Sequence, residues 1–403
     1  MTKTLYSLLF YIISLSAFAQ HPACDGNRYR NFAFAAVDSA INVQFGHNTT
    51  MNHVAMNLFM DIYQPTPDPA IKRPLIVFIH GGGFVAGSRK DMTGISILFA
   101  AEGFVTATID YRLIDIPPVD SQTVAEGIIQ AMGDANAAVR FFVEDAATGN
   151  TYKIDTNYIF ISGSSAGGVT AAHVAYLDTT DNIPPYFSSL IASNGGFEGN
   201  SSANTNYSAH IKGVLNYSGA LWRKEWISYG EPPLYSFHDA QDTIVPCGHG
   251  IPKAFPFALY VDGSCAMQQE ADLKGIYNGI FIYPGSGHGG YFNSHPTVDT
   301  VFKRSSDFLY NIICTDILSI NEPENSISKI LVYPNPAQNN FTIELPLQNV
   351  TLEIYDVTGR KILSQQNISD RTQIDCSRFI DGVYFIQTFN EKSRFYQKLT
   401  IAK

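Results

Sequence analysis

Residues 158–168 read YIFISGSSAGG, an apolar run that leads directly into a serine turn bounded by glycines. The apolar, β-rich residues before the turn predict a strand, and the alanine-rich residues after it, 166–177, predict a helix. Gly163 and Gly167 stand two positions before and after Ser165, where a sharp strand-to-helix turn needs small residues because the backbone folds back on itself. The stretch therefore predicts that the Ser165 hydroxyl is presented at the carboxyl edge of a β-sheet.

Strand and helix patterns alternate around this turn, from about Met56 to Ile313. This alternation predicts the α/β class, with a mostly parallel central sheet covered by helices on both faces. Strands are predicted at 75–79, 104–110, 158–162, 211–217, 234–238 and 280–283, and helices at 122–144, 166–177 and 297–313. Residues 178–208, rich in Asn, Ser and Gly, are expected to form an insertion over one end of the sheet, either a lid or binding loop or a disordered segment.

The strand at 75–79 ends in a second glycine motif, His80-Gly81-Gly82-Gly83-Phe84. Acyl transfer places negative charge on a carbonyl oxygen, which needs preplaced N–H donors, and glycines let backbone amides approach closely. We expect Gly82 and Gly83 to donate, together with Ala166, the residue after the serine. The alternative is an ordinary glycine turn. His80 is expected to shape the loop rather than to act as an acid or base.

A nucleophilic serine also needs a general base and an acid that orients it. His288 follows the strand at 280–283 within the loop Gly285–Gly290, where this topology delivers a base. Its rivals, His238, His249 and His295, do not follow a strand in a glycine-rich loop. Asp239 and Asp242 both follow the strand at 234–238 and are the candidate acids. Ser164, one position from the apex of the turn, is the competing hydroxyl.

Residues 58–309 resemble the HGGG-type carboxylesterase and lipase branch of the α/β hydrolases. The similarity includes the two glycine motifs, the segments 61–65 (DIYQP) and 110–112 (DYR), and the chain order serine, aspartate, histidine. In this branch the aspartate of an HG-x-x-D-x-x-VP stretch is the acid, which corresponds to Asp242 and leaves Asp239 as the alternative. The resemblance implies ester hydrolysis through an acyl-serine intermediate, with Ser165, Asp242 and His288 as catalytic residues and without a metal or organic cofactor.

The substrate is less well defined by the sequence. Phe84, Trp222 and Tyr291 are candidates for lining an acyl or alcohol pocket, with ordinary packing as the alternative for each. The ester could be a small ester, a carbohydrate ester or a polyester. A serine peptidase of the same fold and an inactive surface binding protein are the rival functions.

The N-terminus and the cysteines indicate export. Residues 1–19 combine Lys3, an apolar stretch and the small-x-small sequence Ala17-Phe18-Ala19, which predicts a cleaved signal peptide; the apolar stretch is too short for the alternative, a membrane span. Export permits disulfides. Of the five cysteines, Cys247 with Cys265 and Cys24 with Cys314 are the suggested pairs, which leaves one cysteine unpaired. The net charge of −10 argues against nucleic-acid and anionic-membrane partners.

The C-terminal part differs from the rest. The expected catalytic domain spans 20–315, a polar linker spans 316–328, and alternating short strands from 329 to 403 predict a small all-β sandwich. The YPNP sequence at 333–336, the turn at 356–360 and the DGVYF sequence at 381–385 resemble the C-terminal sorting domain of the type IX secretion system of Bacteroidetes. The resemblance implies export through the periplasm by that machinery, to a secreted or surface-attached state. An adhesive or carbohydrate-binding sandwich is the alternative.

Overall fold

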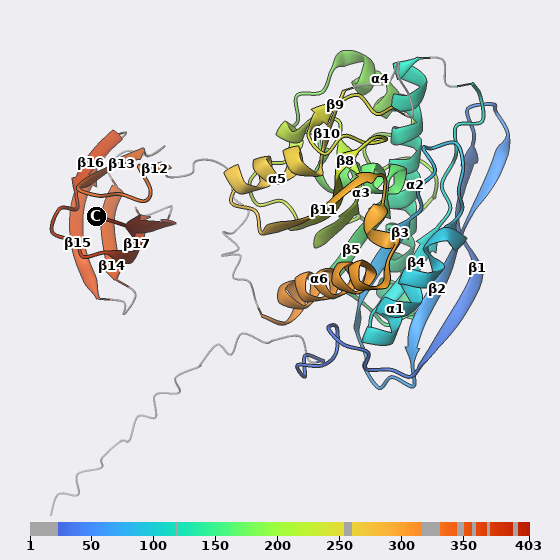
Figure 1. Ribbon diagram of the computed structural model, residues 1–403, viewed down its shortest axis with the longest axis horizontal. Helices are drawn as coiled ribbons and strands as arrows, with labels where there is room; N and C mark the ends of the chain where they lie inside the picture. Colours follow the sequence, from blue (N-terminus) through green and yellow to red (C-terminus); the bar gives the residue numbers. More distant parts are fainter. Residues whose placement is uncertain are drawn as a thin grey trace, which may run out of the picture. The chain divides into compact units, whose positions relative to one another are not determined.

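The computed structural model describes residues 23–117, 120–253, 260–315, 331–344, 350–356, 360–368, 371–389 and 394–403. The chain forms two compact units, which divide between Ile317 and Leu318 (Figure 1). Each unit is described here by itself. The predicted signal peptide and linker lie outside the described residues.

The N-terminal unit is built on a mixed sheet of eight strands in the order β1-β2-β4-β3-β5-β6-β8-β11 (Figure 1). The six strands from β4 to β11 run parallel, and β1 and β2 pair antiparallel at one edge. The strands are β1 (Ala36–Thr49), β2 (Ala55–Thr66), β3 (Arg73–Ile79), β4 (Val105–Ile109), β5 (Ile154–Ser164), β6 (Gly213–Tyr217), β8 (Leu234–Asp242) and β11 (Asn278–Gly287). The predicted α/β-hydrolase architecture is thus confirmed.

Both faces of this sheet are buried, and β3 shows how. Leu75, Val77 and Ile79 belong to one hydrophobic cluster, and Ile76 and Phe78 belong to the other. Since successive strand residues point to opposite faces, an unbroken apolar run fits a central strand covered on both sides. The first cluster is covered mainly by α2 (Ser121–Thr148) and α3 (Ala166–Tyr176), and the second by α1 (Thr93–Glu102) and α6 (His295–Cys314).

Several elements were not predicted from the sequence. The edge strand β1 is mostly exposed and shows no regular alternation, so its sequence carries no clear strand signal. Other elements of this unit that were not predicted are β2, α1, α4 (Pro185–Ser193), α5 (Ser264–Leu273) and the small sheet of β7 (Ala220–Leu221), β9 (His249–Gly250) and β10 (Val261–Gly263). Short helices with few residues per face leave little periodicity to detect.

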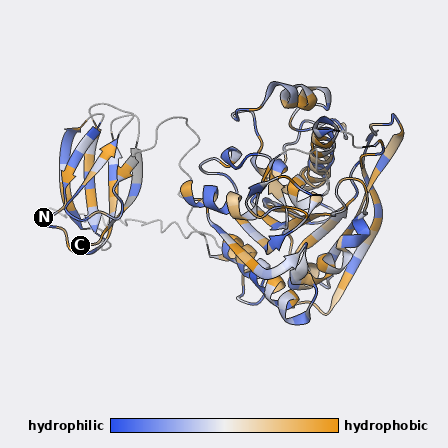
Figure 2. Ribbon diagram, turned by 45° about the horizontal axis from the view of Figure 1, so that its top comes forward, coloured by the Kyte–Doolittle hydropathy of each residue, from blue (hydrophilic) through white to orange (hydrophobic). Residues whose placement is uncertain are grey.

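The C-terminal unit is all-β. A sheet of β12, β13 and β16 and a sheet of β15, β14, β17 and β18 share one hydrophobic cluster. Figure 2 shows hydrophobic and hydrophilic residues alternating along these strands, as expected where one face of each sheet is buried. The strands are β12 (Leu331–Tyr333), β13 (Asn340–Glu344), β14 (Val350–Asp356), β15 (Lys361–Ile368), β16 (Arg371–Asp375), β17 (Gly382–Phe389) and β18 (Arg394–Ile401).

Two disulfides occur within the N-terminal unit, in the two pairings suggested from the sequence. Cys24 is bonded to Cys314 at the end of α6, and Cys247 is bonded to Cys265 at the start of α5. Cys376 is free and buried in the C-terminal unit. Among the described residues, no helix combines the length and the apolar character needed to cross a membrane.

Candidate active site

Ser165 lies at a strained turn between β5 and α3. Its backbone has φ 54° and ψ −118°, and its amide donates to the carbonyl of Tyr217 at 2.7 Å. A Cβ atom at Gly163 would lie 2.1 Å from the carbonyl oxygen of Gly167, and one at Gly167 would lie 2.1 Å from that of Ile79. Only glycine fits at these two positions, which explains the spacing of the motif.

The glycine loop 81–83 lies beside this turn because β3 and β5 are neighbours, with Ile79 paired to Gly163. Gly82 adopts φ 109°, and a Cβ there would lie 2.1 Å from the carbonyl oxygen of Ala86. In the described part of the chain the amides of Gly82 and Gly83 donate to no protein acceptor. The amide of Ala166 belongs to the first turn of α3, whose N–H groups lack helical partners. The structure thus brings the three expected donors to one place.

Residues 110–114 hold this loop in place through hydrogen bonds and ring stacking. Tyr111 is buried, its hydroxyl donates to the carbonyl of His80 at 3.1 Å, and its ring stacks on the His80 imidazole at 4.3 Å. The amide of Ile114 donates to the carbonyl of Phe84 at 2.7 Å. His80 itself bonds the carbonyl of Gly81 through Nδ1 at 2.7 Å, as a loop-shaping residue would. The loop is therefore held in one conformation before any substrate binds.

An ion-pair cluster secures the far end of the same loop. The guanidinium of Arg89 pairs with Asp61 at 3.0 Å and with Asp110, whose carboxylate also accepts the Arg89 amide at 2.9 Å. Arg112, two residues after Asp110, forms a fully buried pair with Asp134 at 2.8 Å. The DIYQP and DYR segments noted in the sequence thus supply the supports of the glycine loop.

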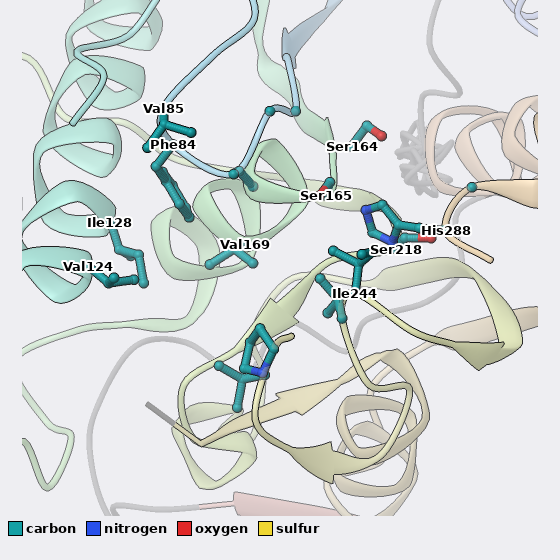
Figure 3. Close-up of a pocket in the computed structure, with 18 of the residues that line it drawn as sticks. Phe84, Val85, Val124, Ile128, Ser164, Ser165, Val169, Ser218, Ile244 and His288 are labelled. Atoms are coloured by element: carbon teal, nitrogen blue, oxygen red, sulfur yellow. The ribbon is translucent and has the colours of Figure 1, made fainter. Parts of the chain in front are cut away.

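His288 and Asp242 meet because β8 and β11 are parallel neighbours, with Asp242 paired to Gly287. The Nδ1 of His288 lies 2.7 Å from Oδ2 of Asp242. The other ring nitrogen, Nε2, is buried and has no hydrogen-bond partner in the described part of the chain. Figure 3 shows the imidazole beside Ser165, at the edge of the same cavity (Figure 3).

Asp242 is held as a carboxylate. Burial by itself would raise its pKa, but the hydrogen bond with His288 and those from the amides of Ile244 and Val245 lower the pKa below the usual aspartate value. The two amides donate to Oδ1 at 2.8 and 2.9 Å, whereas Oδ2 faces Nδ1 of His288 at 2.7 Å. A carboxylate in this position fixes the proton on Nδ1 and leaves Nε2 free to accept one.

Asp239, the alternative acid, contacts the same loop differently. Both of its carboxylate oxygens accept the amide of Gly290, at 2.9 and 3.1 Å, and it is fully buried. The structure therefore places Asp242, and not Asp239, against the imidazole.

The rival histidines have other hydrogen-bond partners. His238 is buried between the Ser264 hydroxyl and the Val245 carbonyl, with its Nε2 3.4 Å from Oδ2 of Asp242, and His249 pairs with Asp262 at 2.9 Å. His295 begins α6. Of these four described histidines, His288 lines the cavity.

The cavity next to Ser165 has a volume of about 610 Å³. Its polar lining consists of Ser164, Ser165, Ser218, His288 and the backbone of Gly81, Gly82, Gly83 and Gly289. The rest is hydrocarbon: Phe84, Val85, Val124, Ile128, Val169, Ile244, Val245, Pro252 and Val261, with Ala166 and Phe292. A mostly apolar pocket with a few convergent polar groups is typical of a small-molecule site.

Of the three expected pocket residues, Phe84 lines the cavity and the other two do not. Trp222 is covered by an aromatic cluster, with its ring 3.9 Å from that of Phe187 and 5.9 Å from that of Trp226. Tyr291 is fully buried behind the site, and its hydroxyl bonds Ser218 at 2.8 Å. The expectation for these two residues is therefore wrong for this cavity, because packing partners already cover both rings.

The insertion at 178–208 is also not a lid over this cavity, since none of its residues lines it. It packs against α2 instead. Arg140 bonds the Glu198 carbonyl at 2.6 Å, Asn136 bonds the Phe197 carbonyl at 2.9 Å, and Ser201 contacts Arg112 at 3.1 Å. The expected lid or binding loop is thus wrong for this cavity, because the segment's polar residues bind the body of the unit.

Sequence reasoning missed the aliphatic residues of the cavity lining and three further residues near the site. Ser218 directly follows β6 and lines the cavity, Phe292 lines it from the turn after His288, and Tyr111 holds the glycine loop. The first had a detectable signal, since it follows the strand next to β5 and the carboxyl ends of parallel strands share one edge.

Comparison with known proteins agrees with this architecture. Residues 60–222 match the BD-FAE family model, and residues 331–402 match the model of the secretion system C-terminal sorting domain. A BD-FAE domain, which is an esterase-type α/β-hydrolase domain, thus covers residues 60–222, and a type IX sorting domain covers residues 331–402. That domain marks the protein for secretion or export to the cell surface, which confirms the predicted localisation.

Individual relatives match over shorter stretches. The chain is 32% identical to mouse carboxylesterase 3B over 137 residues, covering 33% of this chain and 23% of that protein. It is 32% identical to esterase LipI of Mycobacterium tuberculosis over 133 residues (32% and 38%), and 33% identical to an endo-acting ulvan lyase of Formosa agariphila over 125 residues (29% and 24%). The chain thus spans well under half the length of these curated relatives.

Similar solved structures include Thermogutta terrifontis esterase 2 phosphorylated by paraoxon and a truncated form of a carbohydrate esterase from gut microbiota. The first has a TM-score of 0.49 at 20% identity and covers 69% of this chain and 95% of that one. The second has a TM-score of 0.48 at 21% identity, with 68% and 96% covered.

Proposed function

We propose that this protein is an exported serine hydrolase that cleaves carboxylic esters through an acyl-enzyme intermediate on Ser165. The single observation that carries the proposal is the 2.7 Å contact between Asp242 and His288 at the edge of the cavity that Ser165 and the free glycine amides also line. A nucleophile, an oriented base and oxyanion donors in one mostly apolar cavity are the components of acyl transfer.

The first half of the reaction forms the acyl-enzyme. As Oγ of Ser165 attacks the ester carbon, its proton passes to Nε2 of His288, and Asp242 stabilises the imidazolium. The carbonyl oxygen becomes an oxyanion that accepts hydrogen bonds from the amides of Gly82, Gly83 and Ala166. The imidazolium then protonates the leaving alcohol oxygen as the carbon–oxygen bond breaks.

The second half uses water. His288 removes a proton from a water molecule that attacks the acyl carbon, and a second oxyanion forms in the same place. Its collapse releases the carboxylic acid and returns the proton to Oγ of Ser165. No redox step or cofactor is required for this sequence.

The test compares the purified protein with Ser165→Ala and Ser164→Ala on p-nitrophenyl acetate and butyrate. Ser165→Ala should lower kcat by about 10⁴-fold or more, and Ser164→Ala by far less, because only Ser165 occupies the apex of the turn. Paraoxon treatment, followed by mass spectrometry, should add one phosphoryl group at Ser165. An inert wild type, or a Ser165→Ala variant with full activity, contradicts the proposal.

The same assay separates the rival functions. Hydrolysis of a peptide p-nitroanilide at rates comparable with the esters would favour a peptidase. A correctly folded wild type that neither hydrolyses esters nor reacts with paraoxon would favour an inactive binding protein. Acetylated xylan, feruloylated sugars and a polyester film then define the natural ester. Loss of the protein from the cell exterior after removal of residues 329–403 would support type IX machinery as its export partner.

A further inference from the structure

The cavity beside Ser165 has a chemically distinct end formed by side chains of α2. Val124 and Ile128 stand four residues apart and therefore lie on the same face of this helix. Phe84, Val85 and Val169 complete this end, and all five side chains are hydrocarbon. Figure 3 shows Val124 and Ile128 on the far side of Ser165 from His288 (Figure 3).

The position of His288 decides which half of an ester enters this end. If the proposed function holds, the leaving alcohol oxygen must lie next to the imidazole that protonates it. The acyl group, bonded to the same carbon, then extends away from His288. Ile244 lies on the His288 side in Figure 3, so it would contact the leaving alcohol and not the acyl group. The acyl chain therefore meets the α2 side chains.

The α2 wall is firmly held. Val124 and Ile128 are each only 4% exposed, and the helix is buried along most of its length. The Asp120 side chain caps its N-terminus by accepting the amide of Thr123 at 2.8 Å. A wall of this kind favours an acyl chain by burying its CH₂ groups and offers no partner to a polar substituent.

We propose that Val124 and Ile128 form the end wall of an acyl-binding arm, and that the enzyme prefers esters of aliphatic acids longer than acetate, without polar groups on the acyl chain. This inference rests on the proposed function and adds a substrate class to it. Ile128 is the specificity-determining residue, because it occupies the α2 face one helical turn beyond Val124.

The experiment measures kcat/KM for p-nitrophenyl acetate, butyrate, hexanoate and octanoate. In the wild type, kcat/KM should rise by about fourfold for each CH₂ group that the arm buries, until the arm is full. In Ile128→Phe the ratio of hexanoate to acetate kcat/KM should fall at least tenfold, since the larger ring shortens the arm. Methyl 6-hydroxyhexanoate should be cleaved at least about fivefold less efficiently than methyl hexanoate, because its hydroxyl finds no partner.

A matched pair of variants controls for effects of the substitution on folding. Ile128→Val and Ile129→Val remove the same single methyl group from adjacent residues of α2, but Ile129 does not line the cavity. Ile128→Val should shift the acyl chain length with the highest kcat/KM toward longer chains, and Ile129→Val should leave the dependence on chain length unchanged.

The outcomes distinguish the two proposals. If no ester is cleaved, the proposed function fails. Suppose that acetate is cleaved, but kcat/KM does not rise with acyl chain length and Ile128→Phe has the same hexanoate-to-acetate ratio as wild type. The acyl arm is then overturned and the proposed function stands. If Ile128→Phe instead changes the preference among alcohols at constant acyl length, the arm holds the leaving group and the inference is also overturned.

Discussion

Oδ2 of Asp242 lies 2.7 Å from Nδ1 of His288, while both oxygens of Asp239 face the amide of Gly290 two residues further along the same loop. Two aspartates, three residues apart in the chain, thus bind the same loop: Asp242 binds the His288 side chain, and Asp239 binds the backbone at Gly290. The first contact fixes the proton on the imidazole, and the second fixes the path of the loop.

We expect Asp242→Asn to lower kcat for p-nitrophenyl acetate by about 10⁴-fold, because an amide no longer selects the Nδ1-protonated tautomer of His288. Asp239→Asn is the matched control. It keeps an oxygen that can accept the Gly290 amide, so its loss of kcat should be much smaller. Equal losses in the two variants would contradict the separate roles.

We expect Tyr111→Phe to lower kcat about tenfold with little change in KM, because the glycine amides lose the support of the hydroxyl bonded to the His80 carbonyl. Tyr176→Phe loses a bond of the same kind, from its hydroxyl to the Pro232 carbonyl at 3.0 Å. Both variants should lose about 1 kcal/mol of unfolding free energy, measured by urea denaturation. A kcat loss in Tyr176→Phe as large as in Tyr111→Phe would argue against a specific role for Tyr111.

The two disulfides should differ in their effect on activity. Cys247 lies two residues after Val245, whose amide bonds Asp242, and its carbonyl accepts the Cys265 amide at 2.7 Å. Replacing Cys247 and Cys265 by serine frees this segment, so kcat should fall about tenfold to a hundredfold in protein that is still folded at low temperature.

Replacing Cys24 and Cys314 by serine is the control, since this pair ties the start of the described chain to the end of α6. Either double variant should lose about 2–5 kcal/mol of unfolding free energy. The control should keep its kcat below the unfolding transition. Unchanged kcat in both would show that the Cys247–Cys265 bond does not position Asp242.

Glu102 should make the N-terminal unit less stable at alkaline pH. Burial raises the pKa of this carboxyl from 4.5 to about 7, although the Ser306 hydroxyl donates to it at 2.7 Å. The folded state therefore holds the proton more tightly than the unfolded state, and stability falls as the pH rises from about 4.5 to 7. Glu102→Gln should remove this fall, so at pH 8 the variant should have a higher Tm than wild type, and its free energy of unfolding should be higher by about 3 kcal/mol at most.

Ser306→Ala provides the second measurement. It removes a hydrogen bond that favours the charged carboxylate, so the decline in Tm between pH 5 and pH 8 should become steeper than in wild type. Parallel Tm profiles for wild type and Glu102→Gln across this range would contradict the assignment.

Much of the fold could be predicted because its signals are local. The strand at 158–162, the turn at Ser165 and the helix at 166–177 are neighbours in the chain, and the close approach of Gly167 to Gly163 within this turn dictates glycine at position 163. The central strands are unbroken apolar runs, which reveal burial on both faces. The exposed strand β1 and the short helices α1, α4 and α5 carry weaker patterns and were missed.

The sequence by itself determined the class of fold, the sorting domain and which residue types stand at the carboxyl edge of the sheet, since each depends on residues close together in the chain. Tertiary structure decided which of two aspartates reaches His288, that Tyr111 supports the glycine loop, and that the 178–208 segment binds α2 rather than covering the cavity. It also placed Trp222 and Tyr291 among packing partners and Ile128 at the cavity wall. These facts depend on strand register and on contacts between residues tens of positions apart, which no local pattern specifies.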